Sequence, residues 1–351
     1  MPVNEAKLNE FLGRAVGDIG AAMSTALCII GERLGLYKAM AGAGPMSPAE
    51  LAQKTGTAER YVREWLFNQA AGGYVVYDPM TEKFTLPDEQ ALALADEDSP
   101  VYLHGAHEII TSVIRDQPKI ERAFRTGEGL AWGDHDPCLF SGTERFFRPN
   151  YAGNLVNGWI PALPGVRDVL ERGATVADIG CGHGASTVIM GQAFPKSRFV
   201  GFDFHARSIE VARRAAERAG VAANVRFEQA AASDYPGRGY DFVTCFDCLH
   251  DMGDPVGCAR HVRSTLKDDG AWMIVEPFAS DRPEENLNPV GRVYYAASTM
   301  ICIPNSLAFA GPALGAQAGE SRMREVVTTG GFTRFRRATE TPFNLVFDAR
   351  P

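Results

Sequence analysis

The sequence lacks an excess of positive charge, a long apolar run and a clustered set of cysteines. Its 35 Lys and Arg residues are outnumbered by 43 Asp and Glu residues, and the net charge of −8 disfavours broad binding to a nucleic-acid backbone. Its 7 cysteines are odd in number and scattered, so they suggest no disulfide framework. The first residues, MPVNEAKLNE, contain no basic segment leading into an apolar one, and no secretory signal is expected.

The absence of long apolar runs also bears on membranes. The most apolar early stretch, AAMSTALCII, is too short and too interrupted for a bilayer span. Together with the cysteine usage, this predicts a cytoplasmic protein that does not enter a membrane. What is present is ordinary for a globular protein: 351 residues, 45% hydrophobic and 22% charged, enough for two or three domains.

Residues 1–95 are predicted to form a mostly helical domain that contains a winged helix. Ser47, Pro48 and Glu50 have the spacing of a capped helix start with a capping box. Thr57 is placed to cap a second helix, whose Val62, Trp65, Leu66 and Gln69 share one face. Two short strand-like runs, YVVYD and KFTL, follow and complete the helix–turn–helix and hairpin pattern.

A winged helix raises the alternative of a DNA-binding protein. Between Pro45 and Gln90, however, there are four basic residues (Lys54, Arg60, Arg63, Lys83) against seven acidic ones. A DNA-binding domain is expected to present a basic face. We therefore expect this domain to serve packing or homodimerisation, and we do not expect nucleic acid as a partner.

The rest of the chain predicts a helical connector at residues 96–165 and an α/β domain at residues 166–351. From residue 174 onward, strand-like runs such as TVADIG, RFVGFDF and YDFVTCFD alternate with helical ones, which is typical of a parallel sheet covered by helices. The final runs, FTRFRRATETP and NLVFDA, have no helix between them and predict an antiparallel hairpin. A long insertion at about residues 283–320 is expected to cap the site.

The stretch VADIGCGHGAS, from Val176 to Ser186, predicts a glycine turn between a strand and a helix. Gly180, Gly182 and Gly184 allow unusual dihedral angles and a close ligand. The turn also satisfies a dinucleotide pattern, so a nicotinamide cofactor is an alternative. Asp178 argues against a pyrophosphate, because the two would repel, and favours a ligand with an ammonium group, such as S-adenosylmethionine. Asp203, at the end of the second strand, is placed to accept hydrogen bonds from ribose hydroxyls.

These motifs, together with YDFVTCFDCLHDMGDP and LKDDGAWMIVEP, resemble those of class I S-adenosylmethionine-dependent methyltransferases. With the winged helix, the chain resembles bacterial small-molecule methyltransferases and, more distantly, plant-type O-methyltransferases. The resemblance implies a Rossmann-like, seven-stranded α/β domain, S-adenosyl-L-homocysteine as product, and a cofactor site formed by Asp178, Gly180, Cys181, Gly182, Asp203, Phe204, Ala232, Ser233, Phe246 and Asp247. Ala231 stands where relatives often carry an acid for adenine, so that contact stays open.

The same resemblance places His250 at the position of a catalytic histidine, where it would act as the general base of an O-methylation. A structural or substrate-contacting histidine is the alternative. Asp251 is considered for orienting the ring, or equally for capping a helix. Cys245 and Cys248 form a C-x-x-C motif, but Cys245 ends a strand that is expected to be buried, and no further Cys or His pair offers four ligands, so no metal is expected.

An enclosed, partly aromatic pocket for a small-molecule acceptor is predicted from the connector and the insertion. Its expected residues are Trp132, Phe147, Tyr151, Trp159, Arg292, Tyr295 and Thr299, each of which has core or surface packing as an alternative role. Two other functions stay open: a cofactor-sensing, DNA-binding regulator, and a relative that binds S-adenosylmethionine without transferring its methyl group.

Overall fold

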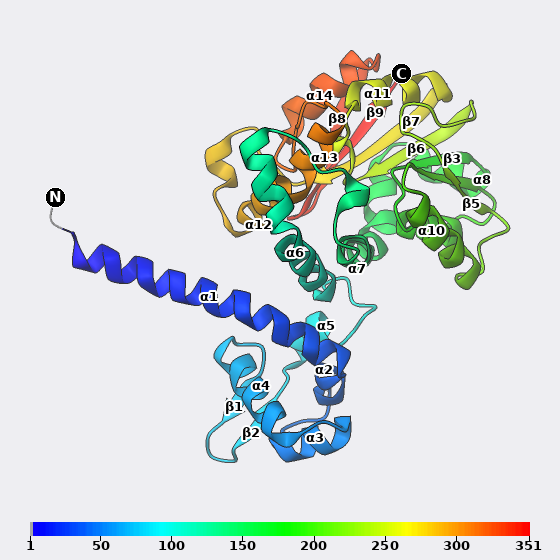
Figure 1. The fold of residues 1–351 in the computed structure, drawn as a ribbon. Helices are drawn as coiled ribbons and strands as arrows, with labels where there is room; N and C mark the ends of the chain where they lie inside the picture. The colour runs from blue at the N-terminus through cyan, green and yellow to red at the C-terminus, as the bar shows by residue number, and fades with distance from the viewer. Residues whose placement is uncertain (1–2) are drawn as a thin grey trace. The chain divides into compact units, whose positions relative to one another are not determined.

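The computed structural model describes residues 3–351, which divide into two compact units (Figure 1). Of the described residues, the first unit comprises 3–111 and Ser141–Pro149, and the second comprises Ser112–Phe140 and Asn150–Pro351. The predicted connector, residues 96–165, is therefore shared between the two units. Its two long helices, α6 (His104–Thr126) and α7 (Cys138–Asn154), each contribute residues to both.

The first unit contains the winged helix. Its elements are α1 (Glu5–Arg33), α2 (Leu36–Met40), α3 (Pro48–Thr55), α4 (Glu59–Ala71), β1 (Val76–Asp78), β2 (Lys83–Thr85) and α5 (Asp88–Leu94). The predicted capping box at α3 is confirmed, since the Ser47 hydroxyl accepts from the Glu50 amide and the Glu50 carboxylate accepts from the Ser47 amide. The cap of α4 is Ala58, without a side-chain bond, so the prediction of Thr57 was wrong. The Thr57 hydroxyl pairs with Thr55 instead.

The core of this unit lies between α2, α3, α4 and the wing. The predicted buried face of α4 is confirmed, because Val62, Trp65, Leu66 and Gln69 are all buried. β1 and β2 pair in antiparallel register, with Tyr77 opposite Phe84. These packed apolar side chains position the winged helix.

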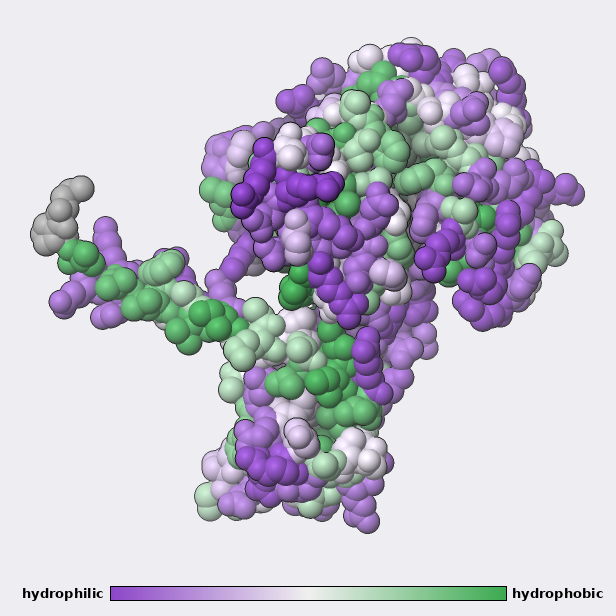
Figure 2. Space-filling model, viewed as in Figure 1, coloured by the Kyte–Doolittle hydropathy of each residue, from purple (hydrophilic) through white to green (hydrophobic). Residues whose placement is uncertain are grey.

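Helix α1 extends beyond the other elements of its unit as one long helix (Figure 1). Apolar side chains follow one another along it (Figure 2). By length and composition alone, this 29-residue helix is apolar enough to cross a membrane, and only 11% of its most apolar window is buried. The run AAMSTALCII is only part of this helix, which is why its length is not apparent from that run alone.

The second unit is built on a seven-stranded sheet in the order β5-β4-β3-β6-β7-β9-β8, which confirms the predicted fold. The strands are β3 (Thr175–Ile179), β4 (Arg198–Asp203), β5 (Val225–Gln229), β6 (Tyr240–Phe246), β7 (Leu266–Pro277), β8 (Arg334–Glu340) and β9 (Asn344–Arg350). The first five are parallel, and β8 and β9 form the predicted antiparallel hairpin beside β7. The central strands are buried on both faces because helices cover both.

The helices of this unit connect and cap the strands. They are η1 (Trp132–Asp134), η2 (Leu155–Trp159), η3 (Ile160–Ala162), α8 (Val166–Arg172), α9 (Ala185–Ala193), α10 (Ala206–Arg218), η4 (Leu249–Asp251), α11 (Pro255–Thr265), η5 (Pro283–Asn286), α12 (Pro289–Ala297), η6 (Ser298–Cys302), α13 (Ile303–Ala308) and α14 (Gly319–Thr329). The strand order reverses between β3 and β6, and ligands of open α/β sheets bind at the carboxyl ends of strands beside such a reversal. The candidate residues follow these strand ends.

Candidate functional site

The glycine turn between β3 and α9 forms an open backbone cradle. Gly180, Gly182 and Gly184 have φ angles of 68°, 52° and 84°. Residues with a Cβ atom rarely adopt such positive angles, whereas glycine does so readily. A Cβ added to Gly180 would lie 2.7 Å from the Cys248 sulfur, so this glycine is required by packing. A Cβ added to Gly182 would meet nothing within 4 Å. Gly182 is therefore the position at which a ligand has room beside the backbone.

Asp178 lies at the end of β3 with its carboxylate fully engaged. Ser186 and Thr187 donate hydroxyl hydrogen bonds to Oδ2 at 2.7 and 2.6 Å, and Thr244 donates to Oδ1 at 2.9 Å. The residue is 1% exposed, and burial raises its pKa to about 6 despite these hydroxyl donors. The carboxylate is therefore held in place by three hydroxyl groups.

Asp203 lies at the end of β4 and connects the two strand ends. Its Oδ2 accepts from the Gly182 amide at 2.9 Å, and its Oδ1 accepts from the His205 amide at 2.8 Å. Burial raises the pKa of the Asp203 carboxyl, which the two amide donors oppose. The next residue, Phe204, is 45% exposed and has an edge contact with Phe309. A carboxylate that fixes the turn thus stands beside an exposed aromatic ring.

The other predicted cofactor residues are distributed around these strand ends. Cys181 is buried, and burial raises the pKa of its thiol, which favours packing over nucleophilic chemistry. Ala232 is half-buried and Ser233 exposed in the segment after β5. Phe246 is buried, with its ring 5.1 Å from that of Tyr151.

Asp247 has a left-handed backbone, with φ of 50°, directly after β6. Non-glycine residues in this region are strained, and such strain is concentrated at functional sites. Its carboxylate accepts from the Tyr151 hydroxyl at 2.8 Å and from the Asn344 amide at 3.0 Å. Burial, reinforced by Glu276, raises the pKa of Asp247 to about 7. Asp247 is thus held by side chains from α7 and β9.

His250 lies in η4, after the fourth parallel strand of the chain, with both ring nitrogens engaged. Nδ1 is 2.5 Å from Oε2 of Glu276 on β7, and Nε2 is 3.2 Å from the sulfur of Cys302 at the end of η6. The other oxygen of Glu276 accepts from the Leu249 amide. His250 and Glu276 are 3% and 2% exposed. Glu276 therefore orients the ring, which is one of the two roles considered for Asp251.

The electrostatics of this pair favour a charged imidazole. Burial alone lowers the pKa of His250, but the Glu276 carboxylate and the Cys302 sulfur outweigh it and raise the pKa well above its usual value. Burial raises the pKa of the neighbouring Asp251 to about 7. In its neutral form, a histidine oriented in this way by a carboxylate can act as a general base.

The predicted pocket residues fall into three groups. Tyr151 and Trp159 are buried, with ring centroids 5.9 Å apart, and Trp132 is half-buried against Phe140. Phe147 belongs to the first unit. Three residues share the exposed face of α12 and η6: Arg292, Tyr295 and Thr299. Their assignment to an acceptor pocket remains a prediction.

Sequence reasoning missed three residues of this site. Glu276 stands in the quoted run MIVEP as a charged residue inside an apolar strand, which is the signal that could have identified it. Asn344 begins β9 and Cys302 ends a π-helical turn, and neither has a local sequence signal. Within residues 3–351, no group of three or more His, Cys, Asp or Glu side chains could hold a metal ion.

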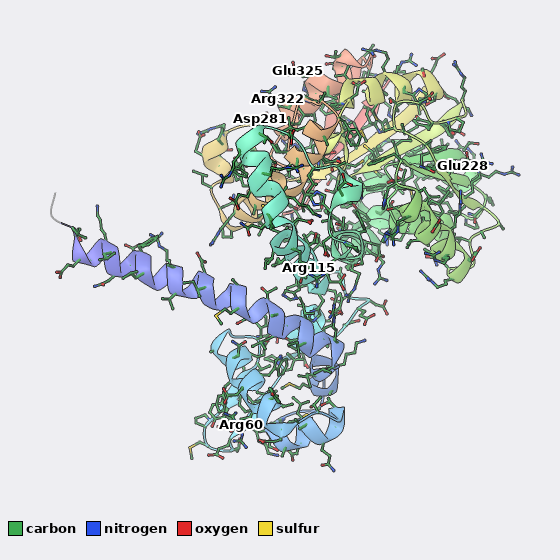
Figure 3. All side chains as sticks on the ribbon, in the orientation of Figure 1. Arg60, Arg115, Glu228, Asp281, Arg322 and Glu325 are labelled. Atoms are coloured by element: carbon green, nitrogen blue, oxygen red, sulfur yellow. The ribbon has the colours of Figure 1, made fainter. Side chains whose placement is uncertain are left out.

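The basic side chains of α4, which would face DNA in a DNA-binding winged helix, are paired within their own helix. Arg60, labelled in Figure 3, bonds Glu64 at 2.5 Å, and Arg63 bonds Glu59 at 2.5 Å. Each pair leaves no net positive charge on this face. The helix therefore offers little attraction for phosphates.

Comparison with known proteins agrees with this architecture. Residues 170–306 match the model of a methyltransferase domain, and residues 21–96 match that of an Rv2258c-like winged HTH domain. The uncharacterised methyltransferase YcgJ of Bacillus subtilis is 31% identical over 122 residues, which are 34% of this chain and 47% of that protein. The chain spans about half the length of the curated relatives that it matches first, 47% and 52%.

Two solved structures extend the likeness to the whole chain. The mitomycin 7-O-methyltransferase MmcR has a TM-score of 0.69 at 21% identity, covering 99% of this chain and 100% of that one. An O-methyltransferase family protein from Burkholderia thailandensis has a TM-score of 0.69 at 17% identity, covering 100% and 99%. At these identities the likeness shows the fold, and the sequence-based prediction of that fold is confirmed.

Proposed function

We propose that this chain, in which a methyltransferase domain follows a winged-helix domain, is an S-adenosylmethionine-dependent methyltransferase that methylates a small molecule on oxygen. The observation that carries the proposal is the buried Glu276–His250 pair beside the glycine turn of β3. A general base is needed when the methyl acceptor is a hydroxyl. The names of the structural neighbours point to the same chemistry.

The residues at the strand ends fit this cofactor. The open space at Gly182 admits a ligand against the backbone, and the charge of Asp178 suits an ammonium group. Asp203 has carboxylate lone pairs for ribose hydroxyls, and the exposed ring of Phe204 offers a surface for adenine. When bound, the cofactor supplies an electrophilic methyl group on a sulfonium. The residues proposed to bind the cofactor are Asp178, Gly180, Cys181, Gly182, Asp203, Phe204, Ala232, Ser233, Phe246 and Asp247.

In this mechanism the protein aligns the acceptor and removes its proton. Glu276 fixes the His250 ring through Nδ1, so that Nε2 is the atom that takes the acceptor's proton. The low exposure of both side chains excludes water and strengthens their interaction. Glu276 also stabilises the imidazolium that forms. The aromatic cluster of Tyr151, Trp159 and Phe246 is proposed to close one side of the acceptor site.

The experiment that tests the function is incubation with methyl-labelled S-adenosylmethionine and fractionated metabolite extracts. Label in one small molecule, with an equal amount of S-adenosylhomocysteine, is the expected result. Label in DNA or protein alone would contradict a small-molecule acceptor. Cofactor binding without any S-adenosylhomocysteine would instead support a relative that does not transfer methyl.

Cofactor affinity is expected to fall at acidic pH because of Asp178. Its pKa of about 6 means that the carboxylate is ionised at neutral pH and protonated as the pH falls through that value. A ligand ammonium group beside Asp178 favours the ionised carboxylate, so the dissociation constant of S-adenosylhomocysteine should rise ~10-fold between pH 7 and pH 5. Calorimetry in two buffers of different ionisation enthalpy measures both the affinity and the proton release.

The control for this pH dependence is Asp178→Asn, which keeps the size of the side chain and one of its two acceptor oxygens but cannot titrate. Its affinity should be weaker at pH 7 and nearly constant down to pH 5. Asp203 also has a raised pKa, and it would be the titrating group if the Asn variant retained the full pH dependence.

We further propose a cytoplasmic homodimer that forms through the first unit. Leu12, Val16, Ile19 and Met23 recur on α1 at the spacing of a coiled-coil seam and are 47%, 67%, 60% and 72% exposed. An apolar stripe on one side of a helix suits a second copy better than a lipid core, which favours apolar residues all round. Figure 2 shows hydrophobic residues exposed along α1.

The dimer is tested by Ile19→Glu, which would bury an unpaired charge in the interface and weaken association by about 100-fold or more. Sedimentation should give twice 38.1 kDa for the wild type and 38.1 kDa for the variant. Ala21→Glu, on the opposite side of α1, is the matched control and should stay dimeric. If the wild-type protein is monomeric and binds lipid vesicles, the dimer proposal is wrong and a membrane-bound form takes its place.

A further inference from the structure

The sulfur of Cys302 lies against the ring nitrogen of His250 that faces away from Glu276. The Nε2–Sγ distance is 3.2 Å, and the Nδ1–Oε2 distance is 2.5 Å. The three side chains come from η6, η4 and β7, and their residues are 8%, 3% and 2% exposed. A nucleophile, a base and an orienting carboxylate in series is the arrangement that activates side chains in covalent catalysis.

Cys302 also occupies an unusual backbone position. It ends η6, a π-helical turn between α12 and α13, and such turns are frequent at functional sites. Cys181 is equally exposed, at 8%, but its sulfur lies near the Gly182 carbonyl, and its charged neighbours are Asp203 and Asp178. The two thiols are therefore equally exposed, but only Cys302 has an imidazole beside its sulfur.

We propose that Glu276, His250 and Cys302 form a reactive-thiol site at which Cys302 is alkylated by small soft electrophiles. When the imidazole is neutral, the thiol gives its proton to His250 Nε2 as the sulfur forms a bond to the electrophilic carbon. The bond from that carbon to its leaving group breaks, and the leaving group departs with the electron pair. This inference depends on the three side chains and holds whether or not the chain transfers methyl groups.

The reactivity is expected to depend on His250 rather than on the thiol alone. Burial raises the pKa of the Cys302 thiol, whereas the neighbouring imidazole opposes that rise. The acids Asp251 and Glu276 also face this thiol and disfavour an isolated thiolate. A thiolate at this position is therefore favourable only as the partner of a protonated His250 held by Glu276.

Alkylation of Cys302 would also affect the proposed acceptor site. An adduct on Cys302 would lie beside Nε2, the atom that is proposed to take the acceptor's proton. Alkylation is therefore expected to prevent base catalysis without reaching the glycine turn. Binding of S-adenosylhomocysteine should survive the modification.

The test is the rate at which iodoacetamide labels each cysteine of the folded full-length chain, followed by peptide mass spectrometry. Cys302 should be labelled about tenfold or more faster than Cys181, which has the same exposure. His250→Gln should lower the Cys302 rate about tenfold, and Glu276→Gln should lower it to a smaller extent. His261→Gln, on α11, changes a histidine that bonds the Tyr235 carbonyl, and it should have no effect.

Each outcome decides the proposal. Labelling of Cys302 no faster than that of Cys181 would overturn it, as would an unchanged rate in a folded His250→Gln protein. The comparison of Cys302 with Cys181 needs no substitution, so it stands even where thermal melting shows that the His250 variant is unfolded. Neither measurement uses a methyl acceptor, so the failure of this inference is distinguishable from the failure of the proposed methyl transfer.

Discussion

Replacing His250 with alanine is expected to lower the rate of methyl transfer by ~10²-fold or more while cofactor affinity stays nearly unchanged. The reason is that Nε2 is the base for the acceptor's proton, whereas the cofactor is held at the ends of β3 and β4. The rate of S-adenosylhomocysteine formation with the labelled acceptor measures the first quantity. Calorimetry with S-adenosylhomocysteine measures the second.

The controls for this variant follow from the burial of Glu276. Removing His250 leaves that carboxylate buried without its partner, which destabilises the fold, so His250→Gln should be compared as the milder change. His261→Ala serves as the matched substitution away from the site. Unchanged turnover in both His250 variants would remove the base assignment. Loss of cofactor binding in either would indicate a structural role.

The pH profile provides a second readout of the same assignment. Because Glu276 helps raise the pKa of His250, the ring becomes a base only as the pH rises through that raised pKa. Turnover should therefore increase with pH in the wild type. In Glu276→Gln, burial then lowers the pKa of His250, and the rise should move to lower pH.

The fold could be predicted from sequence because its signals are local. Strands β3, β4 and β6 are short apolar runs that are each followed by a helix, and the glycines of the turn are required by its own backbone angles. The capping box at Ser47 and the buried face of α4 are equally local patterns. Such patterns are decided within about ten residues of chain, so they survive without tertiary information.

The site was harder to predict because its contacts join distant segments. The partner of His250 is 26 residues away on β7, and the second partner is 52 residues away in η6. Asp178 was expected to face a ligand, but hydroxyls from α9 and β6 surround its carboxylate, and only the folded sheet brings Thr244 beside it. Residue type and strand position located the site, whereas tertiary packing determined which side chains meet there.

Replacing Asp203 with alanine is expected to weaken the binding of S-adenosylmethionine by ~10- to 100-fold, because hydrogen bonds to a charged group contribute ~1.5–3 kcal/mol each. The carboxylate holds the Gly182 and His205 amides and is proposed to accept from the ribose hydroxyls. Both the turn and the ligand therefore lose a partner. Turnover at saturating cofactor should change much less, since Asp203 lies away from the transferred proton.

Asp241→Ala separates this effect from general destabilisation. Asp241 stands near the opposite end of the sheet, where it accepts from the Thr175 amide and from Lys267. Asp241→Ala removes one carboxylate charge, as Asp203→Ala does, yet its cofactor affinity should match that of the wild type. Equal losses in both variants would mean that the sheet, rather than the ribose contact, had been weakened. Wild-type affinity in Asp203→Ala would remove Asp203 from the proposed cofactor site.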